Sequence, residues 1–287
     1  MKQVNSKDPI GIFDSGVGGL TVMRALIEDL PGEDMLYLGD TARVPYGNRG
    51  AETVRRYALN AAELLVDHSI KALVVACNTA SAFALETLKA SVSIPVFGVI
   101  EPVARAAAAM TTTGHIAVLG TRGTIRSEAY QEALLNLQPT LHVHPLPCPL
   151  LVPLAEEGWT EGMVTEEILR HYLVSFSHSD VDTMILGCTH YPLLAAAIEK
   201  VAREVVSPGV KLVDSARATS QAVTSALGER GLLREATQPG EHRFLLTDLP
   251  EGFISTAERF FGRSLDGACE HVDIRDRSVE RGSKEVI

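Results

Sequence analysis

Two cysteines of this chain lie in closely matching sequence contexts. Cys77 follows the apolar run 73–76, and Cys188 follows the apolar run 184–187. Each run predicts a buried strand that ends at the thiol, followed by a polar turn and a helix. The amino terminus of a helix favours a thiolate and lowers the thiol pKa from about 8.5 towards neutral pH. Two such thiols suit a reaction that removes a proton from one face of a substrate and delivers one to the other.

Hydrogen-bonding side chains follow both thiols directly. Asn78 and Thr79 come after the first thiol, and Thr189 and His190 come after the second. These side chains add donors beside each thiol, and His190 could also relay protons. The alternative is that each cysteine only packs, because an unpaired cysteine after an apolar run is usually a small buried hydrophobe. The repeated context favours the chemical interpretation.

Two further polar turns are predicted at strand ends. Residues 14–19 (DSGVGG) close a strand and open a helix, and their glycines expose backbone N–H groups that can hold a carboxylate or phosphate. This turn matches neither the P-loop nor the dinucleotide-binding pattern. Residues 39–47 are rich in turn formers and could present Tyr46 and the backbone of Gly47 to a small ligand. A packing turn and an ordinary surface loop are the respective alternatives.

Short apolar runs alternate with amphipathic segments almost throughout the chain. The apolar runs predict strands at 9–13, 35–38, 70–76, 95–99, 115–119, 141–145, 181–187, 210–213 and 243–247. The amphipathic segments predict helices at 19–30, 51–68, 80–90, 102–110, 124–137, 160–176, 192–205, 215–229 and 252–262. This alternation predicts an α/β fold with largely parallel sheets flanked by helices. Ligands bind such sheets at the carboxyl ends of the strands, where the thiols and turns are expected.

A loose internal repeat predicts two similar domains. Residues 10–16 and 116–123 each combine a strand with a small-residue turn, and each cysteine follows its unit at a similar spacing. Chance similarity between common strand–turn units is the alternative. We interpret the strand 210–213 as the chain crossing back to complete the first domain. The predicted division is 1–98 with 208–287 for one domain and 99–207 for the other, with the active site in the cleft between them and a flexible, charged tail at 275–287.

Composition excludes several classes of function. A net charge of −10 on 287 residues argues against a nucleic-acid-binding surface, and no apolar run approaches the ~18 residues of a membrane span. The first ten residues contain no apolar signal region. The four cysteines lack metal-ligand spacing and are too few for a disulfide framework. We therefore expect free thiols in the cytoplasm and proton transfer without cofactor or metal, with Cys148 and Cys269 taking no part.

Four segments together resemble the glutamate racemases of the aspartate/glutamate racemase family. They read IGIFDSGVGGLTV, YLGDTARVPYG, VVACNTAS and LGCTHYPLL, in this order, and the resemblance extends roughly from Pro9 to Phe261. It implies two α/β domains and a cofactor-independent enzyme that interconverts L- and D-glutamate, supplying D-glutamate for peptidoglycan. Glutamate is then the small-molecule partner, with neither nucleic acid nor membrane involved. The oligomeric state stays open, and a homodimer is one arrangement.

The resemblance also implies roles for individual residues. Cys77 and Cys188 would be the two acid/base groups, one thiolate removing the α-proton while the opposite thiol protonates the other face. Asp14 and His190 would assist the neighbouring thiols. The substrate-binding residues implied in the same way are Asp14, Ser15, Tyr46, Gly47, Asn78, Thr79, Thr189 and His190.

A carboxylate that assists the thiols is implied as well. The family's Pro-Leu-x-Glu stretch matches residues 153–156, which assigns this role to Glu156, with the adjacent Glu157 as the alternative. Two other functions stay open. One is an aspartate or broad-specificity amino-acid racemase, which would share the two-thiol logic. The other is a two-lobed binding protein with a secondary role in binding DNA gyrase.

Overall fold

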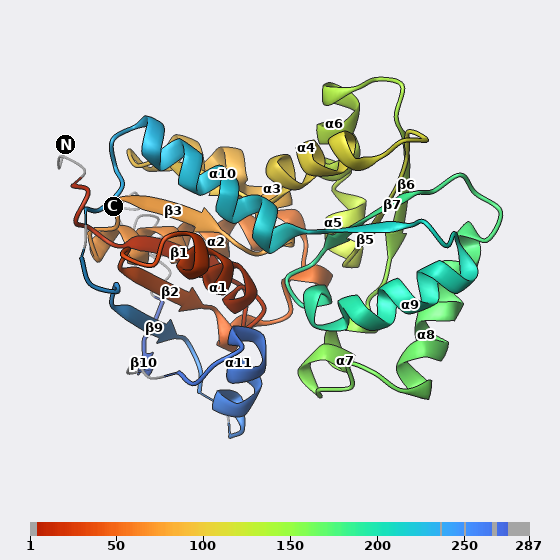
Figure 1. The fold of residues 1–287 in the computed structure, drawn as a ribbon. Coiled ribbons are helices and arrows are strands. Elements are labelled where there is room, and N and C mark those ends of the chain that lie inside the picture. The colour runs from red at the N-terminus through yellow and green to blue at the C-terminus, as the bar shows by residue number, and fades with distance from the viewer. Residues whose placement is uncertain (1–4, 236, 250, 266–268, 275–287) are drawn as a thin grey trace, which may run out of the picture.

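The computed structural model contains two parallel β-sheets with helices on their faces (Figure 1). It describes residues 5–235, 237–249, 251–265 and 269–274. The tail that we predicted to be flexible, 275–287, lies outside the described residues. No helix within the described ranges is long and apolar enough to span a bilayer.

The first sheet has six strands within the described residues, in the order β10-β9-β2-β1-β3-β4, and all neighbours are parallel. Their bounds are β1 Ile10–Asp14, β2 Met35–Gly39, β3 Ala72–Val75, β4 Val96–Gly98, β9 His242–Leu246 and β10 Cys269–His271. Every residue of β1, β2 and β3 is buried, as expected for parallel strands covered on both faces.

The second sheet has four strands in the described chain, in the order β6-β5-β7-β8, and they are again parallel. Their bounds are β5 His115–Gly120, β6 His142–Pro147, β7 Thr183–Gly187 and β8 Lys211–Asp214. β8 corrects our interpretation of the strand predicted at 210–213, because it pairs with β7 and extends the second sheet as far as Asp214. The chain therefore returns to the first sheet after residue 214 and not at residue 208. The division into two domains otherwise stays a prediction.

Helices separate most of the strands. Their bounds are α1 Leu20–Asp29, α2 Ala51–Asp67, α3 Asn78–Ser91, α4 Ile100–Met110, α5 Arg122–Arg126, α6 Ala129–Leu137, α7 Leu151–Glu156, α8 Met163–Leu173, α9 Ala195–Val205, α10 Ser215–Glu229 and α11 Phe253–Phe261. Short 3₁₀ helices are η1 Thr41–Arg43, η2 Tyr46–Asn48, η3 Val174–Phe176 and η4 Tyr191–Leu194.

Each predicted strand and helix has a counterpart, and three local differences have physical causes. The helix predicted over 124–137 is divided at Glu128, whose φ of 59° lies in the left-handed region and interrupts the helix. α7 was not predicted, because its six residues are too few to show a helical period. β10 was not predicted, because its three residues, Cys-Glu-His, form a short and only partly buried edge strand.

We call each sheet, together with the helices packed on it, a lobe. In the first lobe, α1 packs on one face of the sheet with Ile10 and Ile12, while α2 and α3 pack on the other face with Phe13. This alternation follows from the two-residue period of a strand. Because all strands of a sheet run in the same direction, the segments that follow β1, β2 and β3 meet at one edge of the first sheet. The segments that follow β5 and β7 meet in the same way at one edge of the second.

Candidate active site

A small cavity lies where these two edges face each other. Its volume is about 40 Å³, enough for a few water molecules and far below the hundreds of Å³ typical of drug-sized pockets. Segments that follow β1, β2 and β3 line it from the first lobe, and segments that follow β5, β6 and β7 line it from the second. The lining residues that the sequence predicted are Ser15, Tyr46, Gly47, Cys77, Asn78, Thr79, Glu156, Cys188, Thr189 and His190.

Cys77 caps the amino terminus of α3 from the first lobe. The backbone N–H of Ala80 donates to its Sγ at 3.4 Å, and Sγ also hydrogen-bonds with Ser15 Oγ at 3.5 Å. Burial and then the charge of Asp14 raise the pKa of this thiol to about 12, against the lowering effect of both hydrogen bonds. The expectation of a lowered thiol pKa is thus wrong for Cys77, because burial and Asp14 outweigh the lowering effect of the helix terminus.

Cys188 lies at the end of a hydrogen-bonded chain from the second lobe. Its Sγ is 3.9 Å from His190 Nδ1, and His190 Nε2 is 3.0 Å from Glu156 Oε1. Burial alone would lower the pKa of His190, but the hydrogen bonds with Cys188 and Glu156 outweigh it and raise the pKa to about 10. The imidazole is therefore cationic at pH 7. It can stabilise negative charge on the adjacent sulfur or supply a proton to it.

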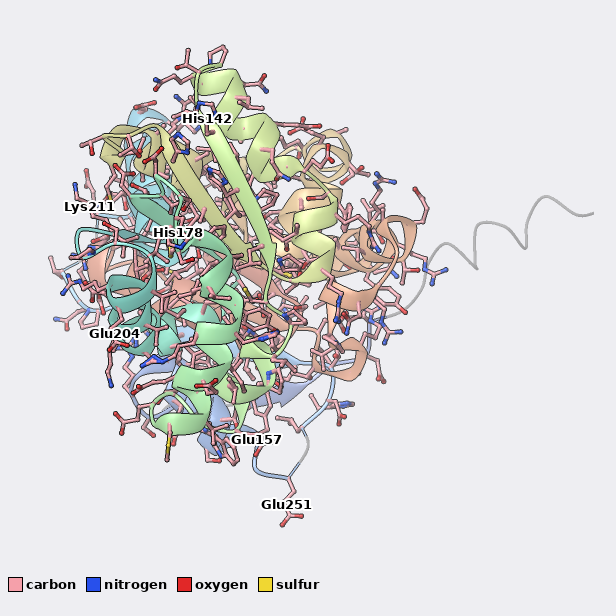
Figure 2. The ribbon with its side chains drawn as sticks, turned by 90° about the vertical axis from the view of Figure 1, so that its right-hand side faces the viewer. His142, Glu157, His178, Glu204, Lys211 and Glu251 are labelled. Atoms are coloured by element: carbon pink, nitrogen blue, oxygen red, sulfur yellow. The ribbon has the colours of Figure 1, made fainter. Side chains whose placement is uncertain are left out.

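The contact with His190 also distinguishes Glu156 from its neighbour. Glu156 lines the cavity, whereas Glu157 is exposed to solvent at the end of α7 (Figure 2). Successive side chains on a helix point about 100° apart, so only one of two adjacent glutamates can face the imidazole. The structure places the side chain of Glu156 in this position, and its assisting role stays a prediction.

Asp14 lies directly behind the cavity and does not line it. The side chain is fully buried, and its Oδ2 accepts from the N–H of Gly16 at 2.9 Å. Burial raises the pKa of Asp14, although the charge of His190 and nearby backbone N–H groups act in the opposite direction.

The glycines after Asp14 allow close packing. A Cβ built on Gly18 would lie 2.6 Å from His190 Nδ1, and one on Gly19 would lie 2.9 Å from the carboxyl carbon of Asp14. Gly18 therefore allows the first turn to touch the loop of the second thiol, and Gly19 allows the turn to pack on Asp14. This close approach favours the packing alternative for Gly18 and Gly19, and the anion-binding role of the turn stays a prediction.

The second predicted turn holds Tyr46 and Gly47 against the other lobe. The Tyr46 hydroxyl donates to Asp40, which also accepts from Arg43 Nε at 2.7 Å, so this hydroxyl is already bound within its own loop. A Cβ on Gly47 would lie 2.7 Å from Cβ of Thr121. Gly47 therefore lets the two lobes come into contact beside the cavity.

Sequence reasoning missed several lining residues, namely Gly16, Val44, Pro45, Thr121 and Val152. Thr121 is informative, because it directly follows β5 in the same way that Ser15 directly follows β1. Its Oγ1 is 3.0 Å from Thr79 Oγ1 and 3.1 Å from Thr124 Oγ1, which links the lobes by hydroxyl hydrogen bonds. The internal repeat was the signal that could have identified it.

The Asn78 side chain is held by the opposite lobe. Its Oδ1 accepts from the hydroxyl of Tyr130, on α6, at 2.6 Å. Asn78 is 2% exposed, and its Nδ2 has no hydrogen-bond partner among the described residues. A buried amide that keeps its N–H groups unpaired beside a cavity is poised to donate to a ligand.

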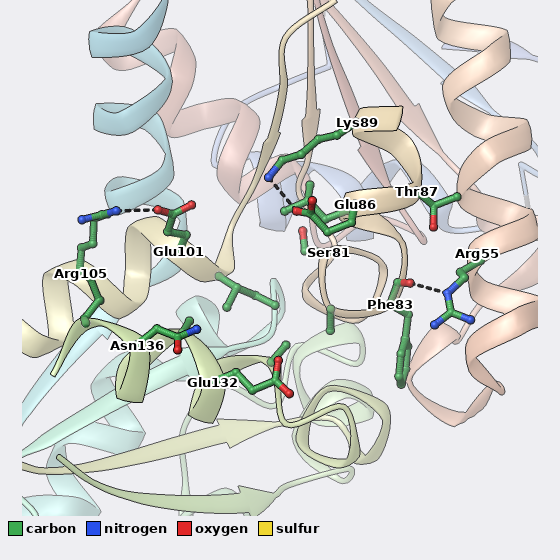
Figure 3. Close-up of a pocket in the computed structure, with 16 residues that line it drawn as sticks. Arg55, Ser81, Phe83, Glu86, Thr87, Lys89, Glu101, Arg105, Glu132 and Asn136 are labelled. Atoms are coloured by element: carbon green, nitrogen blue, oxygen red, sulfur yellow. Dashed lines mark hydrogen bonds and ion pairs between the residues drawn. The ribbon is translucent and has the colours of Figure 1, made fainter. Parts of the chain in front are cut away.

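Larger hollows occur elsewhere, but they lack this chemistry. The α3–α6 groove, lined by residues of α3, α4 and α6 together with Arg55, has a volume of about 620 Å³ (Figure 3). Four of its charged groups form two pairs, Lys89 with Glu86 and Arg105 with Glu101. A hollow of about 590 Å³ is lined by residues 6–7, 231 and 233–235 with 237–239. Neither thiol lines either hollow.

The arrangement at the small cavity can transfer protons. It brings thiols from two different sheets to one enclosed space, with hydroxyl and amide groups between them. Among the described residues, no group of three or more histidine, cysteine or acidic side chains is placed to hold a metal ion. The catalytic and binding roles of the individual residues stay predictions.

Comparisons with known proteins agree with this geometry. A model of the Asp/Glu/Hydantoin racemase family matches residues 10–223. The glutamate racemase of Geobacter metallireducens is 53% identical over 256 residues, covering 89% of this chain and 93% of that protein. The crystal structure of glutamate racemase RacE1 from Bacillus anthracis has a TM-score of 0.88 at 39% identity, covering 94% of this chain and 99% of that one. The Francisella tularensis glutamate racemase, crystallised with D-glutamate, has a TM-score of 0.87 at 36% identity, covering 94% and 98%.

Proposed function

The chain belongs to the Asp/Glu/Hydantoin racemase family, and we propose that it is a glutamate racemase, an isomerase that interconverts L- and D-glutamate. Relatives of this name cover nearly the whole chain, and one of them was crystallised with D-glutamate. The single observation that carries the mechanism is the position of the two thiols. Cys77 and Cys188 follow β3 and β7, in different sheets, and line one cavity.

The two thiols would act as a pair of opposed bases. In one direction the thiolate of Cys188 takes the α-proton of glutamate, and the thiol of Cys77 gives its proton to the opposite face of the planar carbanion. The raised pKa of Cys77 supports its role as the acid in this direction. The reaction leaves Cys188 as a thiol and Cys77 as a thiolate. The other enantiomer then reacts from this form with the roles exchanged.

The developing negative charge is the main obstacle, because a Cα–H beside a carboxylate is a weak acid. Fixed dipoles in a water-poor site can stabilise this charge without reorganising, whereas water molecules would have to reorient around it. Asn78, Thr79 and Thr189 offer such dipoles around the cavity. Cationic His190 can stabilise charge on the Cys188 side of the site. The buried carboxyl of Asp14 is within electrostatic reach of Cys77 and can influence its protonation.

Substrate entry requires the lobes to separate. The cavity of about 40 Å³ is enclosed by both lobes, which touch at Gly47 and Thr121. Closure over bound glutamate would exclude water and bring both thiols to the substrate. X-ray scattering in solution should therefore show a smaller radius of gyration with saturating D-glutamate than without it. An unchanged radius would count against closure.

Deuterium exchange tests the reaction class and the two-base mechanism together. D-glutamate is incubated with the purified protein in deuterium oxide without added cofactor, and both enantiomers are analysed at early times. A two-base enzyme gives L-glutamate with deuterium at Cα, because the donating thiol has exchanged with solvent, while the remaining D-glutamate keeps its protium. Deuterium appearing equally in both enantiomers would contradict the two-base mechanism. Absence of any L-glutamate would refute the proposed function itself.

The cellular role follows from the product. We infer that the protein works in the cytoplasm without a cofactor and that its D-glutamate supplies peptidoglycan synthesis. A bacterial strain that requires external D-glutamate should grow without it when this chain is expressed. A variant lacking Cys188 provides the control, because it should not support growth. The oligomeric state, for which a homodimer is one arrangement, is measured by light scattering.

A further inference from the structure

One buried tyrosine touches the loops of both thiols. Tyr130 lies on α6 of the second lobe and has no exposed surface. Its hydroxyl donates to Oδ1 of Asn78, the residue that follows Cys77. Its ring also lies against Gly187, the residue before Cys188, because a Cβ built on Gly187 would be 3.1 Å from the ring carbon Cε2. No other role for this side chain follows from the proton-transfer mechanism.

The hydroxyl of Tyr130 determines which way the Asn78 amide faces. An asparagine amide accepts hydrogen bonds at its oxygen and donates them from its nitrogen. If the amide were reversed, the buried O–H of Tyr130 would lose its acceptor, which is unfavourable for a buried donor. The observed orientation satisfies the O–H and leaves Nδ2 of Asn78, a residue that lines the cavity, without a partner among the described residues.

We propose that Tyr130 is a positioning residue of this racemase, which holds the Asn78 amide so that Nδ2 donates to the carboxylate of the substrate. The proposal rests on the proposed function, because it assigns a carboxylate ligand to the cavity. A carboxylate accepts hydrogen bonds and cannot donate them when ionised, so only the observed amide orientation is attractive to it. The same donor would stabilise the carboxylate as negative charge spreads onto it during proton removal.

The position of Tyr130 also links this donor to closure. Tyr130 belongs to the second lobe and Asn78 to the first, so their hydrogen bond exists only when the lobes are together. The hydrogen bonds of Thr79 with Thr121 and Thr124 cross the same boundary. Separation of the lobes would free the amide to rotate, and closure would set it again. The substrate-binding donor would therefore be assembled by the same movement that excludes water.

Tyr130→Phe tests the proposal, because it removes the hydroxyl and keeps the ring that packs on Gly187. We expect kcat/KM for glutamate to fall about tenfold or more. The midpoint of thermal unfolding should stay above the assay temperature, so that the variant is assayed in its folded state. Tyr172→Phe is the matched control, because it removes a tyrosine hydroxyl of the same lobe that accepts from Leu150 N, and Tyr172 does not line the cavity. The control should stay within twofold of the parent enzyme. Unchanged kcat/KM in Tyr130→Phe would overturn the proposal.

A double-mutant cycle separates positioning from a general structural effect. If Tyr130 acts through Asn78, Tyr130→Phe should change kcat/KM by less than about twofold in an Asn78→Ala background. A purely structural role would lower kcat/KM by the same factor in both backgrounds, and that result would refute the positioning role. Changes in stability would not produce this pattern, since the assays use protein verified as folded.

Asn78→Asp keeps the proposal testable if Tyr130→Phe does not fold. The aspartate still accepts from Tyr130 but, when ionised, offers no donor to the cavity, so kcat/KM should fall at least as far as in Asn78→Ala. Activity equal to that of the parent enzyme would exclude the donor role. Failure of the parent enzyme to racemise glutamate would instead refute the proposed function. The orientation would then be tested through glutamate binding by calorimetry, in the same variants.

Discussion

Gly18→Ala is a small change whose effect can be estimated from the structure. The new Cβ would lie 2.6 Å from His190 Nδ1 and closer still to Thr189 Oγ1, whereas ordinary contacts begin near 3.4 Å. The loop of Cys188 would therefore move by about 0.8 to 1.2 Å, the shortfall of the contacts with His190 and Thr189 from 3.4 Å. Gly18 has no positive φ, so alanine strains the protein only through this contact.

The expected cost is mainly catalytic. A misplacement of about 1 Å at a reacting group costs on the order of 10²-fold in rate, so we expect kcat to fall about tenfold to a hundredfold. This corresponds to about 1.4 to 2.7 kcal/mol in the barrier. Overpacking should lower the free energy of unfolding by about 1–3 kcal/mol. The substitution should thus leave the protein folded while it displaces the thiol.

The assay follows D-glutamate conversion by circular dichroism, well below the midpoint of thermal unfolding of each variant. Gly209→Ala serves as the control, because a Cβ at Gly209 would meet nothing within 4 Å. We expect the control to be unchanged in rate and stability. If Gly18→Ala keeps the parent kcat within twofold, the cavity tolerates movement of the Cys188 loop. The reasoning from close packing would then be wrong.

Three other predictions follow from the site. Cys77→Ala and Cys188→Ala should each abolish racemisation while circular dichroism shows that the fold is retained. Cys269→Ser should keep activity. Substantial turnover in either alanine variant would exclude the two-base mechanism. D-glutamate should be turned over more than tenfold faster than D-aspartate, a barrier difference above about 1.4 kcal/mol, and comparable rates would indicate a broad-specificity racemase. His190 has a pKa raised to about 10 in the folded protein, so its charge stabilises the fold below about pH 6.5 and that stabilisation is lost as pH rises towards 10. In Glu156→Gln the stability lost at high pH should be smaller. The free energy of unfolding, measured with urea, should therefore fall less between pH 7 and 10 than it does in the parent protein. An equal fall in both proteins would contradict the role of the Glu156 contact.

The fold could be predicted where local pattern determines it. Apolar runs and helical spacing identified the elements, because a buried parallel strand and an amphipathic helix differ in their period. The partner of β8 could not be identified in this way, since its apolar run fits either sheet and only tertiary packing selects β7. The same limit applies to Glu128, where a single backbone conformation divides one predicted helix into two.

The site shows a similar limit. The thiols and their polar neighbours were predicted from motifs and strand ends, and they do line one cavity. The pKa of Cys77 could not be predicted, because burial and the charge of Asp14 depend on the fold and outweigh the local effect of the helix terminus. The contact between Tyr130 and Asn78 joins residues 52 positions apart on different lobes, and no sequence period indicates it.

The helix α6 borders both the active-site cavity and the α3–α6 groove. It directs Tyr130 towards Asn78 at the cavity and presents Glu132 and Asn136 to the groove (Figure 3). A small molecule held in the groove would press on α3 and α6 without meeting glutamate, and its inhibition would be noncompetitive. High glutamate concentrations could not displace such a molecule. The selectivity of such an inhibitor would therefore depend on residues of the groove, and not on the residues that carry out proton transfer.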